Sequence, residues 1–329
     1  MRTLYSGYSG PLYQVCKGSF SPGPDSCPSG MTKDIGVAAG GYADSASQDT
    51  FCSGATCTIS IIYDQSPNKN DLKPAPIGQR GAIDNPANAT DLKTTINGHP
   101  VYGVLIKPVI GYRSGCTACA TATAKGTATG DQPETEYMVT SQQNLIDGCC
   151  FDYGNAETTS HDDNNGTMEA VYFGGGVVWG TGFPGAGSAS ARVTNGPWVM
   201  ADLENGLYAG WENGQDQNIS TNTALKFNFV TAVIVGYTQV ENAGKGRFAV
   251  YGGDATSSSA LKTLYDGVRP AKPGYVPMKK QGSIILGIGG DNSDTAGGEW
   301  YEGVMASGAA MKATVDALQT NIAAAGYGK

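Results

Sequence analysis

Two acidic residues close together in the chain, Asp202 and Glu204, are the first candidates for catalytic chemistry in this sequence. They end the largely apolar run 198–204, which we predict to be a strand. Because side chains alternate between the faces of a strand, we expect both carboxylates on one face, about 7 Å apart. Carboxylates so placed raise each other's pKa and destabilise the fold unless hydrogen bonds or a function retain them. The alternative is a solvated strand end before the turn at Asn205-Gly206.

A third acidic residue, Asp291, follows a predicted buried strand over 283–288 and the glycines Gly289 and Gly290. Such glycines let backbone and ligand approach closely, so this carboxylate could face a substrate. Two other interpretations are weaker. The glycines resemble half of a dinucleotide-binding motif, but Asn292 replaces its last glycine and no alternation of strands and helices surrounds it. A calcium site formed with Asp294 lacks the spacing and the glycine of an EF-hand loop.

Histidine chemistry is limited because the 329 residues include only two histidines. A Ser-His-Asp triad or a multi-histidine zinc site would need His99 or His161. His99 lies in the turn-like stretch 97–100 and His161 in the polar loop 160–166, so we expect both to be solvated. Acid, base and nucleophile roles then fall to carboxylates, and we expect no metal and no other cofactor.

The eight cysteines fall in four close pairs: Cys16/Cys27, Cys52/Cys57, Cys116/Cys119 and Cys149/Cys150. Nearest-neighbour disulfides are the simplest connectivity, and they point to an oxidising compartment, so we expect a secreted, extracellular protein. The adjacent Cys149 and Cys150 could bond to each other in a small strained ring, or each could bond elsewhere, for example to Cys116 and Cys119. A four-cysteine zinc site is disfavoured because adjacent thiolates fit a tetrahedron poorly.

The composition restricts both the fold and the partners. Charged residues make up only 15% of the chain and there are 48 glycines, which is typical of a sheet protein with many turns and not of an all-α fold. The net charge of −8 offers nucleic acid no basic surface. No apolar run is long enough to cross a bilayer. We therefore expect no nucleic-acid or membrane partner, and we expect a monomer.

Strand-like runs separated by Gly, Pro and Asn turns predict the elements that position these residues. They occupy 57–63, 101–106, 168–173, 198–204, 227–235, 248–251 and 283–288. Residues 114–135 are predicted to form a surface loop. Apolar residues at helical spacing in 309–325, followed by Gly326, predict an amphipathic helix. The expected architecture is one all-β domain over 1–329, a sandwich with this C-terminal helix packed against it.

With these segments in place, the chain resembles glycoside hydrolase family 54, the α-L-arabinofuranosidases of the B type. Blocks that carry the resemblance lie in order over nearly the whole chain, at 49–52, 61–66, 149–158, 196–198, 202–205, 287–293 and 301–305. The resemblance implies a concanavalin-like β-sandwich (jelly roll). It also implies retaining, exo-acting release of terminal L-arabinofuranose from plant cell-wall arabinoxylan, arabinan or arabino-oligosaccharides.

The resemblance also implies roles for individual residues. Glu204 would be the nucleophile and Asp291 the general acid/base, with their carboxyls about 5 to 5.5 Å apart as retention requires. The substrate-binding set would be Asp202, Asn205, the backbone of Gly290, Trp179, and Cys149 and Cys150 as a vicinal disulfide under the furanose ring. A Cys52–Cys57 bridge is likewise implied.

The chain also departs from the family. Gly206 stands where the family has a second Asn, so one sugar contact is lost or is made by water. The cysteine pairs at 16/27 and 116/119 are additions, and we expect the catalytic module alone, without an arabinose-binding module. Two rival functions stay open: a non-catalytic carbohydrate-binding lectin on the same sandwich, and a hydrolase for another glycone such as a β-D-galactofuranoside or β-D-xyloside.

Overall fold

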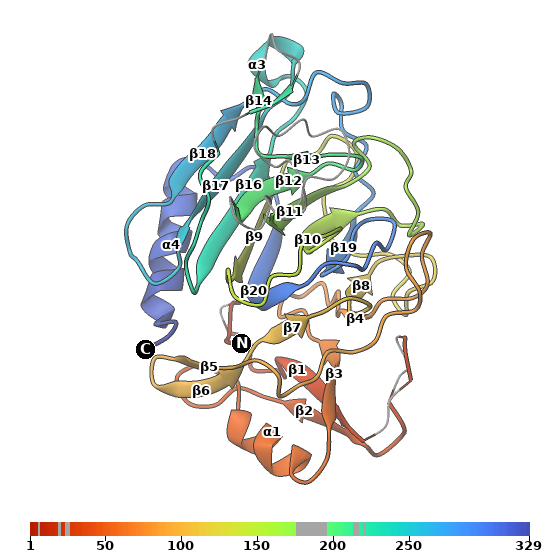
Figure 1. Cartoon of the computed structure of the whole chain (residues 1–329), viewed down its shortest axis with the longest axis vertical. Coiled ribbons are helices and arrows are strands. Elements are labelled where there is room, and N and C mark those ends of the chain that lie inside the picture. The colour runs from red at the N-terminus through yellow and green to blue at the C-terminus, as the bar shows by residue number, and fades with distance from the viewer. Residues whose placement is uncertain (6, 19–20, 24–26, 176–195, 213–216, 220–221) are drawn as a thin grey trace.

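Two antiparallel sheets dominate the computed structural model, which describes residues 1–329 except 6, 19–20, 24–26, 176–195, 213–216 and 220–221 (Figure 1). The first sheet has the strand order β13-β12-β11-β10-β19-β8-β4. Its strands are β4 (Lys73–Pro74), β8 (Tyr112–Ser114), β10 (Asp152–Ala156), β11 (Glu169–Gly174), β12 (Trp198–Asp202), β13 (Leu207–Tyr208) and β19 (Ser283–Leu286). The second sheet has the order β18-β17-β16-β9-β20-β7. Its strands are β7 (Val104–Ile106), β9 (Glu134–Thr140), β16 (Val230–Gly236), β17 (Phe248–Asp254), β18 (Lys262–Gly267) and β20 (Gly298–Ser307).

Smaller elements surround the sandwich. The N-terminal sheet β2-β1-β3 and helix α1 lie together at one end of the molecule (Figure 1). The remaining bounds are β1 (Tyr13–Lys17), β2 (Thr32–Ile35), α1 (Ser45–Cys52), β3 (Cys57–Ile62), β5 (Lys93–Ile96), β6 (His99–Tyr102), β14 (Trp211–Glu212), β15 (Gln217–Asn218), α3 (Glu241–Gly244) and α4 (Lys312–Ala325). Within the described part of the chain, no helix combines the length and the apolar character needed to span a membrane.

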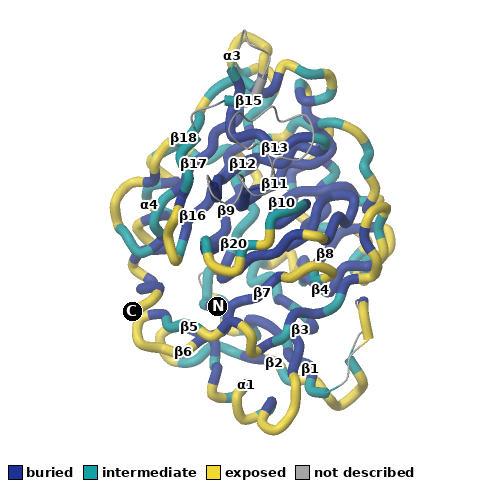
Figure 2. The backbone as a smooth tube through the Cα atoms, viewed as in Figure 1, coloured by how far each residue is buried: buried dark blue, intermediate teal, exposed yellow. Residues whose placement is uncertain are grey.

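The core lies between the inner faces of the two main sheets, whose strands are mostly buried in Figure 2. Val199 and Ala201 of β12 belong to this core, whereas Trp198 and Met200 join a separate cluster on the outer face. This is the alternation that the sequence predicts for a strand. Apolar burial between the sheets is the main stabilising term for a sandwich, and the outer face of the seven-stranded sheet adds the smaller apolar cluster around Trp198 and Met200.

Helix α4 covers the outer face of the six-stranded sheet. Its residues Val315 and Ile322 pack in one cluster with Val233 and Tyr251 of the sheet. The helix ends at Gly326, whose φ of +78° is the left-handed conformation that glycine adopts most readily. The predicted β-sandwich with a packed C-terminal amphipathic helix is confirmed.

Local predictions are mostly confirmed, with informative exceptions. All four nearest-neighbour disulfides are present, including Cys149–Cys150, and 116–119 lies in the predicted surface loop. The predicted strand 101–106 is instead split between β6 and β7 at Gly103. A Cβ atom on Gly103 would lie 3.0 Å from the carbonyl oxygen of Trp300, so the missing side chain lets the chain cross between sheets.

A buried ionic network joins the two sheets beneath the strands that lead to the outer face. The Nζ atom of Lys280, just before β19, lies 2.9 Å from Glu134 Oε1 on β9 and 2.7 Å from Glu169 Oε2 on β11. Arg269 Nη1 lies 2.9 Å from Glu169 Oε1. Burial alone would raise the pKa of Glu169, but the charges of Arg269 and Lys280 lower it to about 2. Each buried charge is therefore matched by an opposite charge.

We predict that Lys280→Met lowers the free energy of unfolding by about 3 to 5 kcal/mol, because it leaves the buried Glu134 without its cation and Glu169 with Arg269 alone. Chemical denaturation at neutral pH measures this. The control is Lys93→Met, which removes an exposed ion pair with Asp49 and should leave stability nearly unchanged. Equal, small effects of the two substitutions would contradict the role of the network.

Candidate active site

A pocket of about 180 Å³ brings together residues from distant parts of the chain at the ends of β10, β12 and β19. Its lining consists of Arg80, Cys149, Cys150, Asp162, Asp202, Glu204, Asn205, Gly289, Gly290 and Asp291. All predicted site residues are therefore in one place except Trp179, which lies outside the described residues. A larger pocket of about 240 Å³, between the N-terminal residues and β20, contains none of them.

Glu204 reaches the pocket from a turn rather than from a strand. β12 ends at Asp202, and Glu204 and Asn205 both have left-handed backbones, with φ of +61° and +57°. Asp202 and Glu204 line the same pocket, as expected, but the predicted strand ends two residues early, so strand alternation is not what places Glu204 there. The turn itself directs Glu204 toward Asp202, whose Oδ1 accepts a hydrogen bond from the Glu204 N–H (3.0 Å).

This left-handed backbone is unfavourable for a residue with a side chain, at a cost of about 1 to 3 kcal/mol, and needs support from its surroundings. Tyr275 donates its hydroxyl proton to the Glu204 carbonyl (2.7 Å), and the hydroxyls of Tyr208 and Tyr275 lie 3.3 Å apart. A Cβ atom on Gly206 would lie 2.5 Å from the Tyr208 ring, so the glycine at this position makes room for that tyrosine.

Asp291 is held by the turn that follows β19. Its Oδ1 accepts hydrogen bonds from the Ser293 hydroxyl (2.5 Å) and the Ser293 N–H (3.0 Å). Its other oxygen, Oδ2, lies 3.5 Å from Arg80 Nε, whose side chain is largely exposed. One oxygen of Asp291 is thus engaged by the protein, and the second is directed to the pocket side with Arg80.

Arg80 was missed by sequence reasoning, although neighbouring glycines are a signal. Gly78 and Gly81 pack so tightly on the turn after β19 that Cβ atoms there would lie 2.3 Å from Asn292 Cβ and 2.1 Å from Asn292 O. The Arg80 N–H also donates to the Asp291 carbonyl (3.0 Å). Glycines at 78 and 81 indicate a close backbone approach, but not which segment they approach.

The Cys149–Cys150 disulfide lines the pocket beside the Asp291 turn. The Cys150 N–H donates to the Ser293 carbonyl (3.2 Å), and the Cys149 carbonyl accepts from the Thr295 N–H (3.0 Å). Cys150 Sγ lies 3.6 Å from Asp202 Oδ2. The disulfide therefore places an apolar sulfur surface next to a carboxylate, a combination that suits the apolar face and the hydroxyls of a sugar.

Three further carboxyl groups surround the pocket, and the sequence argument assigned none of them a role. Asp162 lies on the pocket lining and accepts a hydrogen bond from Asn205 Nδ2 (2.9 Å). Asp152 and Glu157 are fully buried beneath it. The signal that could have identified Asp152 and Glu157 is their place at the start of the strand 152–156 and directly after its end, because this strand has no exposed residue. Asp162 carried no signal, because the loop that contains it resembles any solvated polar loop.

Arg113 on β8 is the buried cation of this region. Its guanidinium donates to the carbonyls of Gly290 (2.9 Å) and Glu157 and to the Ser283 hydroxyl (3.2 Å). Burial lowers the pKa of Arg113 to about 10, opposed by the charges of Glu157, Asp291 and Glu204, so it stays protonated at neutral pH. It joins the strands that carry the acidic residues and also supplies positive charge.

The electrostatics favour neutral carboxyls in part of this cluster. Burial raises the pKa of Glu204, and the charges of Glu157 and Asp202 raise it further. Burial is also the main cause that raises the pKa of Asp202 to about 7, and burial and Asp202 raise that of Asp152. The pocket therefore holds fewer negative charges at neutral pH than it has carboxyl groups.

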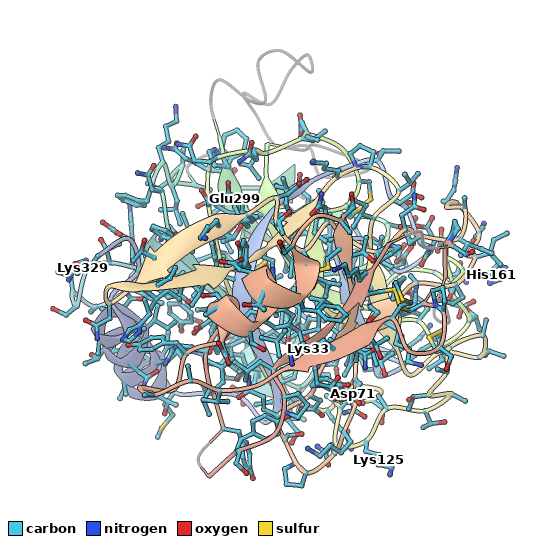
Figure 3. All side chains as sticks on the ribbon, turned by 90° about the horizontal axis from the view of Figure 1, so that it is seen from below. Lys33, Asp71, Lys125, His161, Glu299 and Lys329 are labelled. Atoms are coloured by element: carbon cyan, nitrogen blue, oxygen red, sulfur yellow. A yellow bond between two sulfur atoms is a disulfide. The ribbon has the colours of Figure 1, made fainter. Side chains whose placement is uncertain are left out.

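Neither histidine reaches the pocket. His161 is exposed at the edge of the molecule (Figure 3), with Nδ1 2.8 Å from the Thr159 carbonyl. His99 is exposed as expected, but it begins β6 instead of lying in a loop, and its ring stacks on Tyr42 at 4.6 Å. The alternative of a calcium site at 291–294 gains no support, because Asn292 turns inward and donates to Asp84 Oδ2 (2.9 Å).

We predict that Asp202→Asn removes part of the pH dependence of folding. The folded pKa of about 7 lies above the unfolded value of about 4, so the stability linked to this carboxyl is present below pH 4 and is lost as the pH rises through 7. The neutral amide should raise the unfolding free energy at pH 8, relative to the native sequence, by about 2 to 4 kcal/mol, with no gain at pH 4. Denaturation at both pH values measures this, and an unchanged pH dependence would contradict the shift.

Comparison with known proteins places this geometry in context. The family model for the catalytic part of α-L-arabinofuranosidase B matches residues 1–328. A probable α-L-arabinofuranosidase B from Aspergillus fumigatus is 48% identical over 99% of this chain and 58% of its own length. An arabinofuranosidase/β-xylosidase from Trichoderma koningii is 45% identical over 99% of the chain and 59% of its own length.

Solved structures agree with these matches. A crystal structure of an arabinofuranosidase complexed with arabinofuranosyl-α-1,2-xylobiose aligns with a TM-score of 0.84 and 42% identity, over 99% of this chain and 61% of that one. The chain spans about three fifths of the length of the curated relatives that it matches. With the family model covering nearly every residue, the chain belongs to the α-L-arabinofuranosidase B catalytic family.

Proposed function

We propose that this chain is a retaining, exo-acting α-L-arabinofuranosidase. Its substrates would be terminal L-arabinofuranosyl groups of arabinoxylan, arabinan and arabino-oligosaccharides. The observation that carries the proposal is that Glu204 and Asp291 line one small pocket together with Asp202, Asn205 and the Cys149–Cys150 disulfide. Family membership supports the reaction class, and the complex of a similar protein with arabinofuranosyl-xylobiose supports the substrate class.

The pocket geometry supports exo action. A volume of about 180 Å³ is smaller than the sites that enclose drug-sized ligands, and it suits a single pentose ring. Asp202, Asn205 and the backbone of Gly290 would bind the ring hydroxyls, while the disulfide would lie under the apolar face of the ring. Trp179 is proposed as a further wall on the basis of the family resemblance alone.

The proposed reaction has two steps. Asp291, protonated on the oxygen that Ser293 does not engage, donates its proton to the glycosidic oxygen while the Glu204 carboxylate attacks the anomeric carbon. The aglycone leaves as an alcohol, and a glycosyl ester remains on Glu204. Asp291, now ionised, removes a proton from water, which attacks the same carbon and releases arabinose with retained configuration.

We also propose that the protein is secreted and acts outside the cell. Four disulfides among the described residues support this, because such bonds persist in oxidising compartments.

A β-D-xyloside is a second substrate candidate, favoured by the name of the Trichoderma koningii relative.

The test of function is Glu204→Gln with an aryl α-L-arabinofuranoside. We expect a loss of about four orders of magnitude or more in kcat, because the amide cannot act as a nucleophile, with unchanged thermal unfolding. Asp291→Ala should keep more of the native activity on a substrate with a good leaving group than on one with a poor leaving group. Azide should restore turnover of this variant by attacking the ester intermediate.

Matched aryl β-D-xyloside and β-D-galactofuranoside substrates test the glycone, and proton NMR of the first product tests retention. Native-like turnover by Glu204→Gln would end the assignment of the nucleophile. Sugar binding without any turnover by the native protein would favour a lectin.

A further inference from the structure

Glu157 is a fully buried carboxyl residue that directly follows β10 and lies behind the pocket wall. Its Oε1 accepts a hydrogen bond from the Thr167 hydroxyl (2.5 Å). Its Oε2 receives no hydrogen bond from any donor in the described part of the chain. A buried carboxylate oxygen without a donor is costly, so the position of this atom requires an explanation.

Gly290 locates that oxygen relative to Glu204. A Cβ atom on Gly290 would lie 1.9 Å from Glu157 Oε2 and 2.9 Å from Glu204 Oε2. The two carboxyl oxygens, from segments almost fifty residues apart, therefore converge on the space that the glycine leaves empty. Any larger residue at 290 would displace both.

The surroundings of Glu157 compensate its carboxylate only in part, because burial raises its pKa by more than the charge of Arg113 lowers it. Arg113 is a buried cation whose charge acts on Glu157, but it donates its hydrogen bonds to the carbonyls of Glu157 and Gly290 and not to the Glu157 carboxyl. Arg80 lines the same pocket, but its largely exposed side chain lies 3.5 Å from Asp291. The other titratable groups around the pair, Asp202, Asp162 and Asp291, are acidic. Two adjacent ionised carboxylates would repel strongly in this environment, so the pair must share a proton.

The proposed reaction, together with the exposure of the two groups, decides which partner keeps the proton. Burial raises the pKa of both groups and Glu157 raises that of Glu204 further, whereas the hydrogen bonds with Thr167 and Glu204 and the charge of Arg113 partly oppose the effect of burial on Glu157. Glu157 has no exposed surface, whereas Glu204 is 7% exposed and opens into the pocket. Solvent or sugar reaches only the Glu204 side, and Glu204 must be ionised to attack the anomeric carbon, so in the reactive state the proton of the pair belongs on Glu157.

We propose that Glu157 is a positioning residue for Glu204: it carries the proton of the pair and donates it in a hydrogen bond to Glu204 Oε2. This rests on the proposed function, in which Glu204 is the nucleophile. The hydrogen bond keeps Glu204 ionised and leaves its other oxygen for the anomeric carbon. The proton stays on Glu157 through both steps, so no net transfer is added, and the same bond stabilises the Glu204 carboxylate when the ester breaks.

The test measures kcat/KM against pH in an Asp291→Ala background, with 2,4-dinitrophenyl α-L-arabinofuranoside as substrate. This leaving group departs without a proton, so the loss of activity at high pH no longer reports Asp291. We expect an alkaline limb caused by ionisation of Glu157. In Asp291→Ala/Glu157→Gln the amide still donates but cannot ionise, and the limb should move up by about one pH unit or more.

A second comparison separates positioning from simple packing. In the otherwise native chain, Glu157→Gln should keep kcat/KM within about tenfold, whereas Glu157→Leu, which has no donor, should lose about 10- to 100-fold more. The matched control is Glu136→Gln, which changes another fully buried glutamate of raised pKa, in the core between the sheets, and should leave the alkaline limb in place. An unmoved limb in the Glu157→Gln protein, or equal losses for Gln and Leu, would overturn the proposal.

Thr167→Val provides a test that keeps Glu157 itself, in case its replacements do not fold. The valine removes the donor to Glu157 Oε1, which makes the ionised form less favourable, so the alkaline limb should move to higher pH in the Asp291→Ala background. A limb that does not move contradicts the proposal. If the native chain does not hydrolyse the arabinofuranoside at all, the proposed function fails. If it does, but the alkaline limb stays at the same pH after substitution of Glu157 and of Thr167, only the positioning role is refuted.

Discussion

Repulsion between buried carboxyl groups is the constraint on which the rest of this structure depends. Asp152, Glu157, Asp202, Glu204 and Asp291 converge within one small region, and water cannot screen them as it would at the surface. The fold opposes this repulsion with a buried guanidinium, with N–H and hydroxyl donors aimed at single carboxylate oxygens, and with raised pKa values that keep part of the cluster neutral. Each of these devices needs atoms held within fractions of an ångström.

The sandwich supplies that rigidity. The seven-stranded sheet packs its inner face against the second sheet, and the network around Lys280 joins β9 and β11 to the segment that leads into β19. The polar pocket residues lie at strand ends and in turns on the opposite face, where the backbone can leave the regular pattern. The left-handed turn at Glu204 is possible because Asp202 and Tyr275 bind its backbone from two sides.

Individual residues show where sequence reasoning succeeds and where it stops. Alternation was correct for residues 198–202, because one face of β12 meets the core and the other does not. It failed at Glu204, because a left-handed glutamate has no signature in the sequence and alternation applies only while the strand continues. The predicted continuous strand 101–106 failed for a related reason. The chain breaks at Gly103 because the backbone of Trp300, nearly two hundred residues away, approaches it too closely for a side chain.

The sequence by itself determined the kind of chemistry and the kind of fold. With two histidines, paired acidic residues and close cysteine pairs, it indicated carboxylate chemistry, disulfides and a sheet protein, and these depend on residue type and short spacing. Only the tertiary structure decided which groups act on one another. Arg80, Arg113, Glu157 and Asp162 join Glu204 and Asp291 through contacts between distant segments. The ionisation of a carboxyl depends on burial and on neighbours within a few ångströms, and neither quantity exists until the chain has folded.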